Sequence, residues 1–162
     1  MNFDQFTIRA QEVIQQAFAI ASEKQHQAVE TGHILKALLA SEDGVAGQLL
    51  QKAGADIRDL EHSLDALVSS YPRVSGGEAY LSSGSGKLMQ KALDISRTMQ
   101  DQYVSVEHLL IALSSLNDPV AQLLKGYRIS EKELMKSVAA LRKGGRVNSQ
   151  SAITTPAPTP AT

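Results

Sequence analysis

The chain has 162 residues, of which 43% are hydrophobic and 4% aromatic, with 16 basic and 17 acidic side chains and a net charge of −1. This balance excludes the basic surface that a nucleic-acid-binding protein needs, and the lack of cysteine excludes disulfides and thiolate metal sites. No apolar stretch approaches the ~20 residues that span a bilayer, and the N-terminus lacks a secretory pattern, so we expect a soluble, cytoplasmic protein with an aliphatic core and no nucleic-acid or membrane partner.

Four helices are predicted in the first part of the chain. Apolar residues recur at helical spacing over residues 7–24, and a second helix begins near Thr31. A third helix covers about 45–53, and a fourth begins after Asp56, which is a candidate N-cap. The glycine- and serine-rich segment 69–81 then predicts a linker.

The sequence after this linker repeats the sequence before it. Residues 82–121 match residues 7–46 at a shift of 75, with thirteen of the forty positions identical. The match continues to the end of the last predicted helix after a deletion of one residue. We therefore predict an all-α fold of two tandem four-helix repeats, at about 5–68 and 82–143. Each repeat is too short to bury much core alone, so the two should pack about a pseudo-two-fold axis into one domain, residues 1–145.

The C-terminal part has a clear helix start and a clear helix end. Ser130 and Glu133 form a capping-box pattern at the start of the last helix. That helix should end at Gly144 and Gly145. The proline- and threonine-rich residues 146–162 have no apolar periodicity and are predicted to be disordered.

The segment Gly84-Ser85-Gly86-Lys87 suggests an ATP-binding loop at first sight. A phosphate loop requires Gly, four residues and then Gly-Lys-Ser/Thr, but Leu81 and Leu88 occupy the positions of the first glycine and the hydroxyl residue. In the repeat alignment, Lys87 and Leu88 fall inside a predicted helix. The segment is therefore interpreted as the start of a helix, and the chain is not expected to be an enzyme.

Histidines and acids supply the remaining candidate chemistry. His33 and His108 are repeat mates near the starts of equivalent helices. Neither has a carboxylate or a second histidine at helical spacing, so local hydrogen bonds are favoured over a metal site. No catalytic residue, metal or cofactor is predicted.

One polar cluster has both a structural and a functional interpretation. Asp101 lies in a predicted loop, and Glu107 follows Ser105 in the first turn of a helix, where the helix dipole favours an acid. Alternatively, both acids could offer acceptors to a bound chain beside the apolar Tyr103 and Val104.

Residues 1–150 resemble the N-terminal domain of Clp-family protein unfoldases, and most closely those of the ClpB type. The resemblance rests on these stretches: FTIRAQEVIQQA, VETGHILKALL, YPRVSGGEAYLS, VSVEHLLIALS and LRKGGRVNSQSA. It implies two four-helix repeats with pseudo-two-fold symmetry. It also implies a non-catalytic module, attached flexibly to an ATP-driven hexameric ring, that binds unfolded or aggregated polypeptide weakly and passes it to the ring.

The resemblance also implies a binding groove. Its edge is formed by a threonine and two acids, which correspond here to Thr7, Asp101 and Glu107, and its apolar lining falls near Val13 and Met89. ClpC-like domains that bind phospho-arginine carry Glu-His in both repeats. Only the second repeat has that pair here, because residue 32 is glycine.

A second function remains open at this point. The sequence ends at Thr162 without a motor module. It is therefore either an excised domain of a longer disaggregase or a stand-alone adaptor or regulator that docks on a Clp motor or protease. The two differ in whether the Clp motor ring is a partner in cis or in trans.

Overall fold

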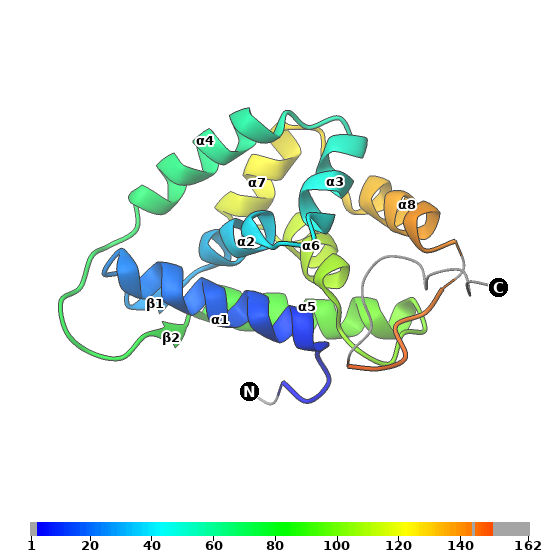
Figure 1. Cartoon of the computed structure of the whole chain (residues 1–162). Helices are drawn as coiled ribbons and strands as arrows, with labels where there is room; N and C mark the ends of the chain where they lie inside the picture. Colours follow the sequence, from blue (N-terminus) through cyan, green and yellow to red (C-terminus); the bar gives the residue numbers. More distant parts are fainter. Residues whose placement is uncertain (1–2, 144, 151–162) are drawn as a thin grey trace.

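The computed structural model describes residues 3–143 and 145–150, which form eight helices and two very short strands (Figure 1). The predicted all-α fold is confirmed. The elements of the first half are α1 (Ile8–Glu23), β1 (Ala28–Val29), α2 (Thr31–Ala40), α3 (Val45–Lys52) and α4 (Ile57–Ser69). Those of the second half are β2 (Tyr80–Leu81), α5 (Ser83–Thr98), α6 (Val106–Ser115), α7 (Pro119–Gly126) and α8 (Glu131–Arg142).

Side-chain caps fix where most helices begin. At five helix starts an N-cap oxygen accepts a backbone N–H three residues on, which satisfies a group that has no partner inside the helix. These caps are Thr7, Asp56, Ser82, Asp118 and Ser130. Since Ser82 caps α5, Gly84 to Lys87 form its first turns. The segment that suggested a phosphate loop is therefore helical.

The contacts between helices follow a two-fold pattern. α2 and α6 contact each other and occupy equivalent positions in the two halves. The contact of α1 with α2 has its counterpart in that of α5 with α6, and α1 with α6 corresponds to α5 with α2. The contact of α3 with α8 likewise corresponds to that of α7 with α4. This exchange of neighbours is what a pseudo-two-fold axis between the repeats requires.

Backbone pairing between the halves has the same symmetry. β1 and β2 pair in parallel, with Val29 opposite Leu81. At the symmetry-related position, Phe6 pairs in parallel with Val104 in a single bridge. Phe6 and Leu81 are repeat mates, and so are Val29 and Val104. The segment that leads into the first helix of each repeat is thus held by the loop of the other repeat.

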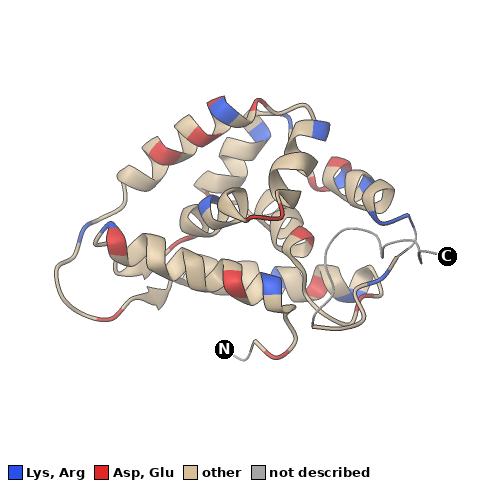
Figure 2. Cartoon of the chain, in the orientation of Figure 1, with Lys and Arg blue, Asp and Glu red and all other residues tan. Residues whose placement is uncertain are grey.

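The core lies around the two central helices. Eight of the ten residues of α6 and seven of the ten in α2 are buried. Both acidic and basic residues occur on α4 and on α8 (Figure 2). None of the helices in residues 3–143 is both long and apolar enough to cross a membrane.

Candidate functional site

The start of α1 meets the loop before α6, and this junction brings together most of the predicted site. The Thr7 N–H donates to the Val104 carbonyl at 2.9 Å, and the Val104 N–H donates to the Gln5 carbonyl at 2.7 Å. The Thr7 hydroxyl is turned inward, where it accepts the Ala10 N–H at 3.1 Å. Thr7 from the first repeat therefore lies beside residues 101–107 of the second.

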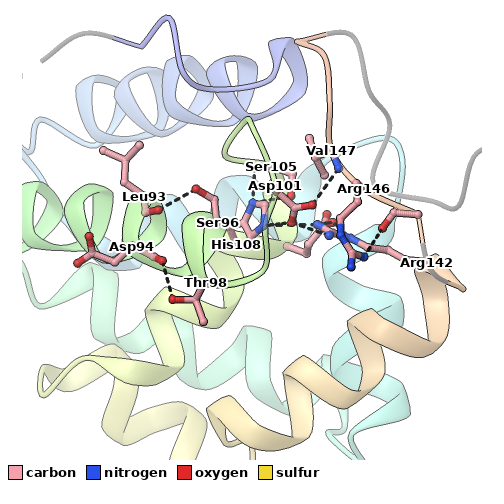
Figure 3. A network of polar contacts seen from close by, with 12 residues as sticks. Leu93, Asp94, Ser96, Thr98, Asp101, Ser105, His108, Arg142, Arg146 and Val147 are labelled. Atoms are coloured by element: carbon pink, nitrogen blue, oxygen red, sulfur yellow. Dashed lines mark hydrogen bonds and ion pairs between the residues drawn. The ribbon is translucent and has the colours of Figure 1, made fainter.

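A buried ion cluster lies behind this junction (Figure 3). Arg142, the last residue of α8, donates from Nε to Glu107 Oε1 at 2.7 Å and from Nη1 to Asp101 Oδ2 at 2.6 Å. A second guanidinium nitrogen, Nη2, also contacts Glu107. Glu107 and His108 are 0% exposed, and Asp101 is 6% exposed. One arginine thus compensates two carboxylates inside the protein, and it ties α8 to the loop before α6.

His108 completes the cluster in a defined tautomer. The Ser105 backbone N–H donates to Nδ1 at 2.8 Å, so the ring proton sits on Nε2 and is donated to Asp101 Oδ2 at 2.7 Å. The local hydrogen bond predicted for this helix-start histidine is confirmed. Its bond to Asp101 was not predicted, because the partner lies seven residues earlier, across a loop rather than along the helix.

The charge of Asp101 is stabilised by its partners. Burial by itself would raise the pKa of Asp101, but hydrogen bonds from His108, the Val147 backbone N–H and Arg142 outweigh it and lower the pKa. Asp101 is therefore ionised at neutral pH. Glu107 is less completely bonded: its Oε2 has no hydrogen-bond partner among the described residues.

The first repeat has a neutral cluster at the equivalent place. The Glu30 N–H donates to His33 Nδ1 at 2.9 Å, so His33 carries its proton on Nε2 and donates it to His26 Nδ1 at 2.8 Å. The Tyr71 ring packs against both imidazoles, with ring centroids 5.7 and 5.1 Å away. Burial, reinforced by the charges of neighbouring groups, lowers the pKa of His33 to about 4. The pKa of His26 is lowered as well, also chiefly by burial.

The two clusters occupy matching positions with different chemistry. His26 is the repeat mate of Asp101, and Gly32 is the mate of Glu107. A Cβ at residue 32 would overlap the Tyr71 hydroxyl and approach Val68, so an acid there requires the Tyr71 side chain to move. A second Glu-His pair is therefore incompatible with this packing. Across residues 3–143 and 145–150, no group of three His, Cys, Asp or Glu side chains is placed to hold a metal.

Most of the predicted site residues are buried. Thr7, Val13, Met89, Asp101 and Glu107 face the interior. Tyr103 is the only member of the predicted set that is partly exposed. In this structure the acids accept hydrogen bonds from the protein itself rather than facing solvent.

Nothing in the sequence indicated that residues 145–150, which we call the exit segment, contact the rest of the domain. The sequence predicted disorder from residue 146, but this segment is hydrogen-bonded to the junction. The Val147 N–H donates to Asp101 Oδ1 at 3.0 Å, and the Ile8 N–H donates to the Gln150 carbonyl at 2.7 Å. Main-chain bonds of this kind leave no signal in composition. The rest of the predicted disordered tail, residues 151–162, lies outside the described residues.

Surface hollows lie on both sides of α1, and two of them bear on the predicted site. One, of about 370 Å³, is largely apolar and is lined by Phe3, Gln11, Ile14, Gln15 and Phe18. The other, of about 360 Å³, has Val13 in its wall, among charged and polar side chains that include Arg9, Glu12, Gln16 and Glu42. Met89 lines neither of these two hollows.

Comparison with known proteins identifies the family. The profile of the Clp repeat (R) N-terminal domain matches residues 5–127, so the chain belongs to this family. It is 40% identical over 151 residues to the chaperone protein ClpB of Bacteroides thetaiotaomicron, covering 93% of this chain and 18% of the relative. Identity to ClpB of Bacillus cereus strain ATCC 14579 is 35% over 155 residues, again covering 18% of the relative. The chain thus spans under a fifth of the length of these chaperones.

Solved structures show the same fold. The Hsp104 N-terminal domain from Candida albicans superposes with a TM-score of 0.79 at 22% identity, covering 90% of this chain and 97% of that one. The N-terminal domain of the caseinolytic protease associated chaperone ClpD from Arabidopsis thaliana gives a TM-score of 0.64 at 25% identity, covering 89% and 98%.

The close contact at Gly32 predicts that alanine destabilises the protein at this position but not at another helical glycine. Gly32→Ala should destabilise the protein by about 1–3 kcal/mol, because the new methyl group overlaps Tyr71. Gly47→Ala in α3 is the matched control: its Cβ meets nothing within 4 Å, so a gain of up to ~1 kcal/mol is expected. Urea denaturation measures both. Adding Tyr71→Phe to Gly32→Ala should recover part of the loss, and failure to do so would contradict the assigned contact.

The histidine pair predicts that stability falls in mild acid. The unfolded chain binds a proton at His33 near the ordinary pKa of about 6.5, whereas the folded chain does so only near 4. This contribution is therefore complete above about pH 6.5 and is lost as the pH falls towards 4, at up to ~1.4 kcal/mol per pH unit. His33→Gln, which keeps a side chain that can complete the capping box, should flatten the dependence in urea titrations at pH 7, 6 and 5. An equal slope in the two proteins would refute the prediction.

The ion cluster predicts strong coupling between Arg142 and Glu107. Arg142→Met leaves two buried carboxylates without their cation and should cost about 3–5 kcal/mol. Adding Glu107→Gln should cost less than the sum of the two single changes, because the remaining charge is reduced. Denaturant melts of the four proteins give the coupling. Arg58→Met on the exposed face of α4 is the control and should stay within ~0.5 kcal/mol of wild type. Additive losses would contradict the assigned pairing.

Proposed function

We propose that this domain binds exposed apolar segments of unfolded or aggregated polypeptide, for transfer to an ATP-driven ring of the ClpB class. Membership of the Clp N-terminal domain family and the identity to ClpB chaperones support this function. The observation that carries it is the apolar hollow on α1. Ile8, at the start of the same helix, adds exposed apolar surface, since 52% of it is accessible.

The apolar lining of this hollow is suited to binding polypeptide segments of many different sequences. Phe3, Ile14 and Phe18 offer apolar surface, which attracts the side chains that a folded protein buries. The Gln11 amide is already engaged by the Phe3 and Phe6 carbonyls, so it supports the wall rather than selecting a partner. A shallow apolar site without a charged anchor favours weak, sequence-tolerant binding, which allows the bound segment to be released to the next component.

The two acids have an indirect role in this proposal. Asp101 and Glu107 hold the loop before α6 and the start of α1 in place through Arg142 and the main chain. Thr7 does the same for α1 by capping it. Changes at these residues would therefore alter substrate binding by moving the walls of the site.

A pair of neighbouring glutamines tests where substrate binds. Gln15 and Gln16 are both exposed on α1, but only Gln15 lines the apolar hollow beside Phe3 and Phe18. Gln16 lies on the other side of the helix, where it lines the polar hollow and a third hollow that contains Ile20. Gln15→Glu places a charge that must lose water when an apolar segment binds. It should weaken binding of a permanently unfolded polypeptide about fivefold, roughly 1 kcal/mol, whereas Gln16→Glu should leave it unchanged. Backbone amide NMR shifts give both the affinity and the location.

The outcomes of this titration are distinct. Weaker binding in Gln15→Glu alone, with shifts around residues 3–18, supports the apolar hollow. Weaker binding in Gln16→Glu alone moves the site to the opposite side of α1, where the hollows that contain Val13 and Ile20 lie. No binding by the wild-type chain overturns the proposal and favours the adaptor alternative, in which the domain docks on a motor or protease instead.

A further inference from the structure

The exit segment crosses the junction without forming a helix or a strand, and Val147 is bonded there through both its N–H and its carbonyl. The Val147 N–H donates to Asp101 Oδ1, and the Val147 carbonyl accepts the Gln102 N–H at 2.9 Å and the Tyr103 N–H at 3.3 Å. Further along, the Gln150 carbonyl accepts the Ile8 N–H. Main-chain pairing of this kind is how proteins bind extended peptides without reading most of their side chains.

Within the exit segment, the Val147 side chain is buried in the protein, whereas the side chains next to it face solvent. Val147 is 2% exposed, whereas Arg146, Asn148 and Ser149 are exposed. The equivalent exit from α4 behaves differently: the Val74 N–H bonds to the Gln25 carbonyl, but the Val74 side chain remains 44% exposed. The pocket for a branched aliphatic side chain is therefore a property of the second repeat and not a general consequence of leaving a helix.

The Ile8 N–H and the Asp101 carboxylate, which hold the exit segment, both require a hydrogen-bond partner. Ile8 is the first residue of α1, and its N–H has no acceptor within the helix. Asp101 is an ionised, buried carboxylate, for which an unfilled acceptor position is costly. Both requirements are for main-chain groups, an N–H and a carbonyl, which any polypeptide can supply.

We propose that the junction formed by Ile8, Asp101, Gln102 and Tyr103 is a binding site for an extended peptide with one small branched aliphatic side chain, and that the exit segment is its resident occupant in cis. A substrate segment displaces the exit segment and takes over its backbone bonds and the Val147 pocket. This inference rests on the proposed function and adds a second, self-occupied site next to the apolar hollow. Substrate affinity is reduced by the fraction of molecules in which the exit segment is seated.

Releasing the exit segment should therefore strengthen binding. Val147→Asp puts a carboxylate against the Asp101 carboxylate and expels the segment, while Val74→Asp makes the same change at the exposed exit from α4. We expect the full-length Val147→Asp chain to bind a permanently unfolded polypeptide about tenfold more tightly than wild type, and the Val74→Asp chain to bind it like wild type. Circular dichroism checks that both variants are folded.

Locking the segment in place should have the opposite effect. The chain has no cysteine, so Ile8→Cys with Gln150→Cys introduces a single pair at positions whose backbones are already bonded. The oxidised protein should bind the unfolded polypeptide more weakly than the same protein after reduction, because the locked segment leaves no molecules with a free junction. The reduced form is its own matched control, and this comparison does not depend on Val147→Asp folding.

A short peptide separates failure of this inference from failure of the proposed function. The probe is the capped hexapeptide Gly-Arg-Val-Asn-Ser-Gln, added in trans to the Val147→Asp chain. Shifts at Ile8, Gln102 and Tyr103, absent with Asp in place of its valine, would support the site even if unfolded polypeptide did not bind. Wild-type polypeptide affinity in the oxidised double-cysteine chain, together with no hexapeptide shifts, would overturn the inference and leave the proposed function standing.

Discussion

Neither four-helix repeat can bury its own central helix, and this constraint determines the architecture. α2 and α6 are apolar around most of their circumference, so each needs cover from both repeats. They obtain it by contacting each other and by contacting the first helix of the opposite repeat. The short parallel pairings of Val29 with Leu81 and of Phe6 with Val104 fix the two repeats in register. Because the start of α1 is held by the second repeat, the junction between them becomes a surface to which both contribute.

The duplicated histidine cap shows how the two halves have come to differ. In both repeats a backbone N–H donates to the histidine Nδ1, and Nε2 then needs an acceptor seven residues earlier. A neutral acceptor, His26, allows the surroundings to be aromatic and uncharged. A charged acceptor, Asp101, requires a cation, and Arg142 supplies it with Glu107 as a second anion. The choice of one acceptor thus accounts for a neutral cluster in one repeat and an ion cluster in the other.

The fold could be predicted from the sequence because helical periodicity is a local pattern and the internal repeat is found by comparing the chain with itself. Thirteen identities in forty positions predicted the duplication, and cap residues such as Asp56 and Ser130 placed helix starts correctly. The candidate site was predictable only in part. The resemblance selected Thr7, Asp101 and Glu107, and the structure brings them to one junction, but no pattern indicated that they are buried. Arg142 is 35 residues from Glu107, and the exit segment is held by backbone atoms, so neither contact is visible in residue types.

The burial of the acids bears on how this domain distinguishes substrates. An exposed carboxylate would favour basic side chains, whereas Asp101 is bonded to Arg142 and His108 through Oδ2 and to a main-chain N–H, that of Val147, through Oδ1. As a peptide site, this arrangement would respond to an extended backbone, which native proteins have mostly paired within themselves, rather than to a particular sequence. Only the pocket that holds Val147 adds a side-chain preference. In the proposed function, a general acceptor and one aliphatic pocket beside the apolar hollow on α1 would together select for the unfolded state, and competition from the exit segment would keep that selection weak enough to be reversible.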